Sequence, residues 1–150
     1  MIYIYCMTTA LNELYQRDLD KAINELNQYE NEEDIWKVRG DIKNSAGTLA
    51  LHMAGNLQHF IGAHLGNTGY VRDRDNEFAA RGVSRADLIA ELEKAKQVLN
   101  DVLPTLSEET LKGEWPEKNP YDFNVEKFLL HLFSHLSWHL GHMNYHRRML

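Results

Sequence analysis

The chain has 150 residues, a length that fits one globular domain with a sizeable apolar core. Apolar residues make up 43% and charged residues 25% of it, as in ordinary globular proteins. The formal net charge is −6 and the basic residues are dispersed, so we expect no nucleic-acid partner. The one cysteine excludes an internal disulfide and a zinc cluster built from cysteines.

No apolar run reaches transmembrane length, so we expect no membrane partner and a cytoplasmic location. The first seven residues are apolar, but they are too few for a secretory signal and lack a basic start. We therefore expect a single domain over residues 1–150, in which residues 1–7 form a loose N-terminal extension. Translation would start at Met1 or at Met7.

Helical spacing of apolar residues predicts a first helix over residues 9–29 and a second over residues 41–65. The second contains three glycines about two turns apart, which indicates close packing of helices. His52 and His59 are seven residues apart, so they fall within ~20° of one another on one helical face. His64 lies well round the helix from both.

Residues 66–83 form a long connection that carries aromatic residues and charges of both signs. It is predicted to be either an ion-paired surface loop, packing Tyr70 and Phe78 against the helices, or a lid over a substrate. A third helix should begin after Ser84, whose spacing to Asp87 resembles a capping box. Pro104 should end or kink that helix.

Residues 106–123 form a second long connection, in which one helical turn is expected over residues 108–112. Two prolines in this segment argue against a strand there. Asn124 is expected to cap the last helix. Four long amphipathic helices without a strand pattern predict an all-α fold, a four-helix bundle with at least one long crossover connection.

The last predicted helix, residues 124–148, is rich in histidine. At about 100° per residue, five of the chain's eight histidines share one narrow stripe of this helix. The surrounding positions are mostly apolar, so these imidazoles should be buried and should need partners. The five are His131, His135, His139, His142 and His146.

Two imidazoles four residues apart on a helix can bind one metal ion, and a third from His52 or His59 would fix the ion in space. The alternative is that core histidines simply hydrogen-bond one another. Imidazole ligands suit Zn, Ni, Fe or Cu without selecting among them. The metallopeptidase motif is absent, because no glutamate lies between His135 and His139.

Residues 131–142 read His-Leu-Phe-Ser-His-Leu-Ser-Trp-His-Leu-Gly-His, and with the nearby Arg148 they resemble the last-helix motif of the DinB/YfiT-like superfamily. Residues 51–57 resemble the segment that supplies the first metal ligand of that family. The resemblance covers nearly the whole chain. It implies a four-helix bundle in up-down-down-up order, usually a homodimer, with a divalent metal ion such as Zn or Ni near one end.

The resemblance also implies a ligand set of His52, His135 and His139, with water in the remaining positions. The chain departs from the family at His142, where glutamine is common. A second departure is that His131, His59 and His146 are also present, as competing ligands or as groups that support the ligands.

Three neutral histidines leave an open coordination position, where a metal ion can acidify water or a thiol. Relatives implied by the resemblance include S-transferases that use low-molecular-weight thiols such as bacillithiol or mycothiol, and a maleylpyruvate isomerase. We therefore expect a metal-dependent thiol S-transferase or hydrolase acting on a small molecule. His59 or His131 would be the catalytic proton carrier, because imidazole titrates near neutral pH.

Three arginines, Arg72, Arg74 and Arg148, could hold an anionic substrate, or could instead form ion pairs within the loop or the dimer. The alternative function is a non-catalytic, metal- or small-ligand-binding dimeric stress protein. DNA binding is disfavoured by the acidic charge.

Overall fold

The computed structural model describes residues 6–118 and 120–150, and all the regular structure within these ranges is helical. The predicted all-α class is therefore confirmed for this part of the chain. Its nearest approach to β-structure is an isolated bridge between Glu114 and Asn124. Residues 1–5 of the predicted N-terminal extension lie outside the described ranges, whereas Met7 is already the first residue of a helix.

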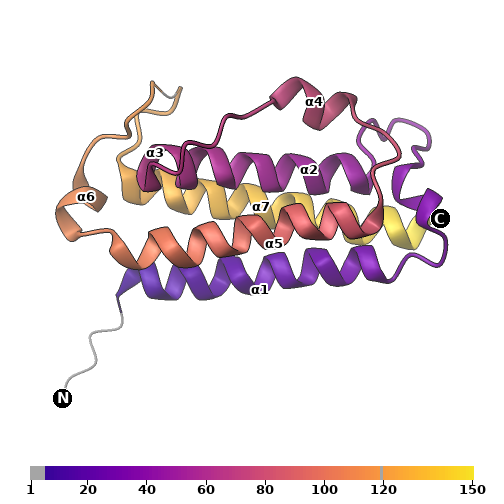
Figure 1. Ribbon diagram of the computed structural model, residues 1–150, viewed down its shortest axis with the longest axis horizontal. Coiled ribbons are helices and arrows are strands. Elements are labelled where there is room, and N and C mark those ends of the chain that lie inside the picture. The colour runs from indigo at the N-terminus through magenta and orange to yellow at the C-terminus, as the bar shows by residue number, and fades with distance from the viewer. Residues whose placement is uncertain (1–5, 119) are drawn as a thin grey trace, which may run out of the picture.

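Four long helical segments run side by side along the molecule (Figure 1). The second of them is continuous through three parts, because a π-helical turn joins α2 to α3 without a break. The segments are α1 (Met7–Asn27), then α2 (Ala46–Leu57) with the π-helix Gln58–Ala63 and α3 (His64–Gly66), then α5 (Arg85–Val102) and finally α7 (Val125–Met149).

Shorter helical pieces occupy the connections. These pieces are the 3₁₀ helices Glu32–Trp36 and Leu103–Thr105, together with α4 (Arg74–Ala79) and α6 (Glu108–Lys112).

Among the described residues, none of the helices is both long and apolar enough to pass through a bilayer.

Side-chain caps set the beginnings of α2, α5 and α7. The Ser84 hydroxyl and the Asn124 carboxamide oxygen accept hydrogen bonds from the backbone N–H groups three residues on, as their sequence positions predict. The second helix begins at Ala46 rather than near residue 41, because Ser45 accepts the equivalent hydrogen bond. The predicted turn over residues 108–112 is present as α6, and α5 ends two residues before Pro104.

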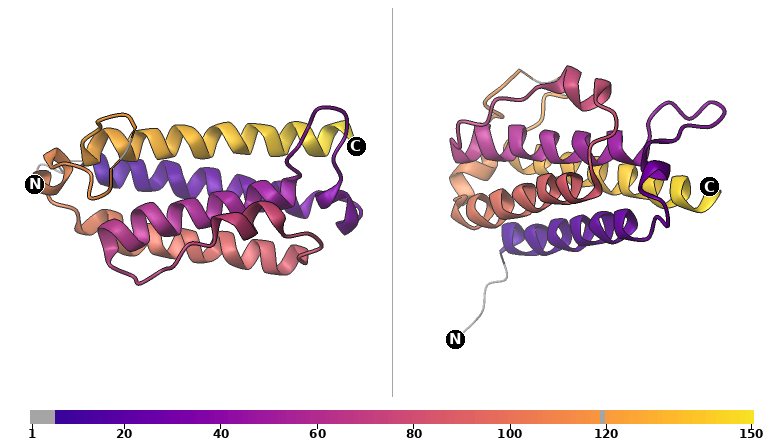
Figure 2. Two further views of the ribbon diagram at one scale, coloured as in Figure 1. Left: turned by 90° about the horizontal axis from the view of Figure 1, so that it is seen from above. Right: turned by 45° about the vertical axis from the view of Figure 1, so that its right-hand side comes forward.

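The packing of the long helices follows a simple pattern. Both α1 and α2 pack against α5 and α7, so α2 lies across the structure from α1 (Figures 1 and 2). In Figure 1, α1 and α7 run toward the end that holds the C-terminus, and α2 and α5 run the opposite way. The short helix α4 lies over the outer side of α2 and contacts it.

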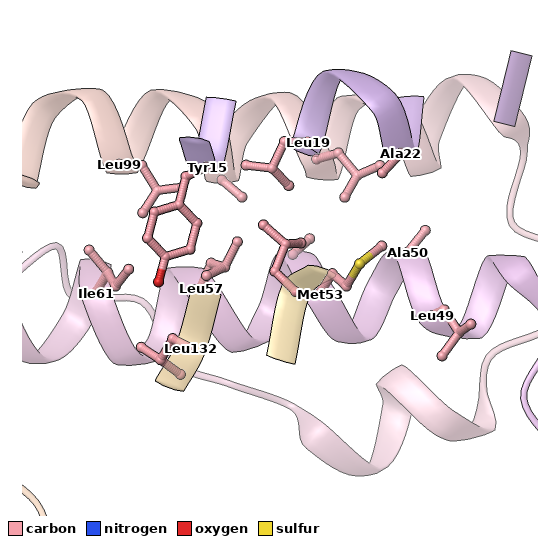
Figure 3. Packing of buried hydrophobic residues seen from close by; sticks show 14 of the residues in the cluster. Tyr15, Leu19, Ala22, Leu49, Ala50, Met53, Leu57, Ile61, Leu99 and Leu132 are labelled. Carbon is pink, nitrogen blue, oxygen red and sulfur yellow. The ribbon is translucent and has the colours of Figure 1, made fainter. Parts of the chain in front are cut away.

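Apolar side chains from all four long segments fill the space between them. Figure 3 shows part of this core, where Tyr15 and Leu19 of α1 face Leu57 and Met53 of α2. The fully buried Tyr15 hydroxyl donates a hydrogen bond of 2.8 Å to the Leu129 carbonyl, which ties α1 to α7. Burial of such side chains fixes the rotation of α2 and α7, and hence the direction of their histidines.

Candidate metal centre

Three histidines from two helices converge on one point. His52 comes from α2, and His135 and His139 come from successive turns of α7. The Nε2 atom of His135 lies 3.3 Å from that of His52 and 3.0 Å from that of His139. Zn–N bonds of about 2.0–2.1 Å separate neighbouring nitrogens by about 2.9 Å in octahedral and about 3.4 Å in tetrahedral geometry. These atoms are therefore close enough together to hold one metal ion.

A buried carboxylate fixes the orientation of the first of these rings. Glu77 of α4 accepts a hydrogen bond of 3.0 Å from Nδ1 of His52 through its Oε2 atom. Because Nδ1 carries the proton in this pair, the lone pair of His52 Nε2 faces the other two histidines. Metal-binding histidines usually make this kind of hydrogen bond with their second nitrogen.

Arg72 completes this arrangement by binding both oxygens of the Glu77 carboxylate. Its Nε atom donates to Oε1 at 2.7 Å, and its Nη2 atom donates to Oε2 at 2.8 Å. Burial by itself would raise the pKa of Glu77, but hydrogen bonds from His52 and Arg72 outweigh it and lower that pKa. Glu77 therefore stays ionised beside His52 at neutral pH.

Glycine at position 55 gives the Glu77 carboxylate its place against α2. A Cβ atom added to Gly55 would lie 2.1 Å from Oε1 of Glu77, well inside van der Waals contact. Phe78, next to Glu77, packs against His52, and the centroids of the two rings lie 4.9 Å apart. The connection over residues 66–83 thus contributes directly to the site. Sequence reasoning missed Glu77, whose only signal was an ionisable residue in an unusually long loop.

The two histidines of α7 are held in the neutral form. Burial, followed by the charges of His52, His131 and Arg72, lowers the pKa of His135 to about 4. Burial, followed by the charges of the neighbouring histidines, lowers the pKa of His139 to about 3. Neutral imidazoles keep the lone pairs that a metal ion requires, so the donor set fits a divalent cation.

A pocket of about 330 Å³ opens beside His135. Its wall is largely aromatic and apolar, and it also includes His131, which lies one turn before His135 on α7. Asn56 contributes a buried carboxamide oxygen that has no hydrogen-bond partner among the described residues. A small molecule in this pocket would therefore meet His135, His131 and an open acceptor together.

Of two further candidates on α7, His146 lies apart from the three converging histidines, whereas the ring of His142 lies 5.8 Å from that of His139. His146 is buried, and its Nε2–H donates to the Lys37 carbonyl at 2.6 Å while its Nδ1 accepts from the Tyr29 hydroxyl at 2.6 Å. Both of its nitrogens are thus used in joining α7 to the segment after α1. His142 is exposed, with its ring 5.0 Å from that of Trp138.

The expectation that His64 lies well round the helix from His59 is wrong. The Nε2 atoms of His59 and His64 lie 3.3 Å apart, because the chain forms a π-helix over Gln58–Ala63. The hydrogen bonds of a π-helix join residues five apart, and its wider turn brings these two positions toward the same side. Burial, followed by the charge of His64, lowers the pKa of His59.

The three arginines have separate surroundings. Arg72 forms the ion pair with Glu77, as the alternative to substrate binding predicts. The Arg74 guanidinium lies 5.0 Å from the centroid of the Phe78 ring. Arg148 donates to the Asn144 side chain at 3.4 Å.

Comparison with known proteins adds a family but no activity. The sequence profile of one family matches residues 2–150, and its description reads "Protein of unknown function (DUF1572)". No curated protein matches the chain.

Proposed function

We propose a metal-dependent function for this chain, which belongs to the DUF1572 family of proteins of unknown function. One divalent metal ion, zinc or nickel, would be held by His52, His135 and His139. The protein would use this ion to act on a small-molecule substrate. The observation that carries this proposal is the convergence of three Nε2 atoms, two of them on rings whose pKa lies far below neutrality. The Glu77 hydrogen bond to His52 supports it, because a carboxylate there strengthens imidazole as a ligand.

The fold part of this proposal is a DinB-like four-helix bundle in up-down-down-up order. Its support is the packing of α1 and α2 against α5 and α7, together with the helix directions in Figure 1. In this order a long connection joins the parallel helices α2 and α5, and its residues 66–83 supply Glu77.

The proposed reaction is transfer of a low-molecular-weight thiol to an electrophilic small molecule, or hydrolysis of such a molecule. A divalent ion supplies the chemistry by lowering the pKa of a thiol or water that reaches it. His131, which lines the same pocket as His135, would take the proton of the thiol or water as its sulfur or oxygen bonds to the electrophilic atom. It would then give that proton to the leaving group, whose bond to the electrophilic atom breaks. His59, the other candidate, faces His64 and Glu117 instead.

Asn56 would position the substrate in this scheme. Its carboxamide oxygen is buried at the pocket wall without a partner among the described residues, so a donor on the substrate would satisfy it. The aromatic wall, which includes Phe60 and Phe128, would cover the apolar part of the substrate and exclude water.

We also propose that the protein acts as a homodimer. Trp138 and Tyr145 lie two turns apart on α7, and 67% and 68% of their surfaces are exposed. Aromatic side chains exposed together on one helix face are typical of residues covered by a protein partner.

The test is an assay of thiol-conjugate formation by the full-length, metal-loaded protein across a panel of electrophiles. We expect turnover that requires the metal and is lost in the His135→Gln variant, which should also lose the ion. The His131→Gln variant should keep the ion and lose most of the turnover. Exposed His142 gives the matched control, because His142→Gln should preserve both properties.

Absence of conjugation and of hydrolysis with every thiol and electrophile would overturn the catalytic proposal. If the same protein still bound one equivalent of metal through His135, the non-catalytic metal-binding function would replace it. If neither the wild-type protein nor the His135→Gln variant binds metal, both the catalytic and the metal-binding functions are overturned.

A further inference from the structure

We propose that His59, His64 and Glu117 form a second divalent-metal site, which shares no ligand with the three converging histidines. The Nε2 atom of His64 lies 3.3 Å from Nε2 of His59 and 3.1 Å from Oε2 of Glu117. The third separation, between His59 Nε2 and Glu117 Oε2, is 3.7 Å. One ion can therefore contact all three atoms.

The π-helix over Gln58–Ala63 creates this site. In an ordinary α-helix, residues five apart would point about 140° away from each other. The wider turn instead brings the two rings to a centroid distance of 4.6 Å in an edge-to-face arrangement. A side chain on Gly62 would meet Val98 of α5 at 2.9 Å, so glycine lets the widened turn lie close to its neighbour. π-Helical turns cost regular hydrogen bonding and occur often at functional sites.

The third ligand comes from the connection before α7, and aromatic packing holds it in place. Trp115 is buried and stacks on Phe128 of α7, with ring centroids 4.1 Å apart. The backbone N–H of Val125 also donates to the Gly113 carbonyl at 3.0 Å. Glu117 follows this anchored segment by two residues, which places its carboxylate against the two imidazoles.

Two imidazole nitrogens and one carboxylate oxygen form a donor set that suits Zn²⁺ and leaves a fourth position open. The side chains of His59 and His64 are 24% and 25% exposed, and that of Glu117 is 47% exposed. An ion here would thus exchange with solvent more readily than one at the buried His52 site. Because Glu117 lines the same pocket as His135, the second ion would lie next to that pocket.

The experiment titrates metal-stripped, full-length protein with Zn²⁺ in competition with a chromophoric chelator. We expect two equivalents per chain. Each of the variants His64→Gln and Glu117→Gln should weaken one equivalent by at least about tenfold and leave the other unchanged. His135→Gln should show the opposite pattern. Exposed Glu114 provides the matched control, and Glu114→Gln should bind as wild type.

A second readout uses Trp115, whose ring centroid lies 6.2 Å from that of His64. In a Trp36→Phe, Trp138→Phe background, binding of Cu²⁺ at the second site should quench the remaining tryptophan fluorescence. Quenching should persist after His135→Gln and disappear after His64→Gln.

The possible outcomes separate this inference from the proposed function. Binding of a single equivalent of Zn²⁺ that is lost only in the His135→Gln variant would overturn the second site. So would a second equivalent whose affinity is unchanged in both His64→Gln and Glu117→Gln. One equivalent lost only in His64→Gln would support the second site and contradict the metal ion proposed for His52, His135 and His139.

Discussion

The Nδ1 atom of His52 lies 3.0 Å from Oε2 of Glu77, so a carboxylate on α4 fixes the ring of an imidazole on α2. Replacing Glu77 by glutamine keeps the shape of the side chain and removes its charge. We expect metal affinity to fall by about 10–100-fold, because His52 loses the anionic partner that makes it a stronger ligand. Chelator competition on the purified variant measures this effect.

Asp75 provides the control for this substitution, because it lies exposed on the same short helix. The Asp75→Asn variant removes the same charge from α4 and should bind metal as wild type does. Equal affinities for Glu77→Gln and wild type would show that Glu77 supports only the fold.

Gly55 gives a separate test of the same contact, because its position decides whether the Glu77 side chain fits. The Gly55→Ala variant places a methyl group 2.1 Å from the present position of Glu77 Oε1. We expect the free energy of unfolding to fall by about 1–3 kcal/mol, since the carboxylate must move and Arg72 with it. Urea denaturation, followed by far-UV circular dichroism, measures the change.

The matched control is Gly141→Ala on α7, where an added Cβ meets no atom within 4 Å. Alanine is the better helix former, so this variant should be more stable by about 0.5–1 kcal/mol. If the two glycine-to-alanine changes alter the free energy of unfolding in opposite directions, the effect of crowding at Gly55 is separated from that of helix propensity. A stabilised Gly55→Ala variant would contradict the described position of Glu77.

Local signals in the sequence predicted much of the fold. Ser84 and Asn124 cap helices through hydrogen bonds that span three residues, so the sequence shows both partners. The closeness of His135 and His139 follows in the same way from one helical turn. The residues alone left the third ligand as His52 or His59, and the family resemblance chose His52, because the three-dimensional approach of α2 to α7 leaves no local pattern.

The parts that could not be predicted depend on contacts between distant segments. Glu77 lies 25 residues from His52, and its approach requires the path of a whole connection. The π-helical turn that joins His59 to His64 breaks the regular periodicity on which the prediction relied. His146 shares the stripe of the other histidines and differs from them only through Tyr29 and Lys37, which come from elsewhere in the chain.

The low pKa values of His135 and His139 predict that acid destabilises the metal-free protein. Above the ordinary histidine pKa of 6.5, both rings are neutral whether the chain is folded or unfolded, so they add no pH dependence. Below that value the unfolded chain binds protons while the folded chain does not, until about pH 4 for His135 and about pH 3 for His139. The free energy of unfolding should therefore fall as the pH drops from 6.5 toward 4.

Each histidine contributes at most about 1.4 kcal/mol per pH unit, and partial exposure of the rings reduces this value. Urea denaturation at a series of pH values, with chelator present, measures the slope. The double variant His135→Gln, His139→Gln should give a shallower slope over the same range. An unchanged slope would show that other groups cause the acid sensitivity.

The hydrogen bond between Tyr29 and His146 predicts a stability effect without a metal effect. The Tyr29→Phe variant leaves Nδ1 of the buried His146 without its donor at 2.6 Å. An unpaired buried acceptor costs about 1–3 kcal/mol, so the midpoint of urea denaturation should fall by a corresponding amount. Metal stoichiometry and affinity should stay at wild-type values, because both nitrogens of His146 are used within the fold. If the Tyr29→Phe variant is fully folded in the absence of urea and still loses metal, His146 would instead belong among the ligands.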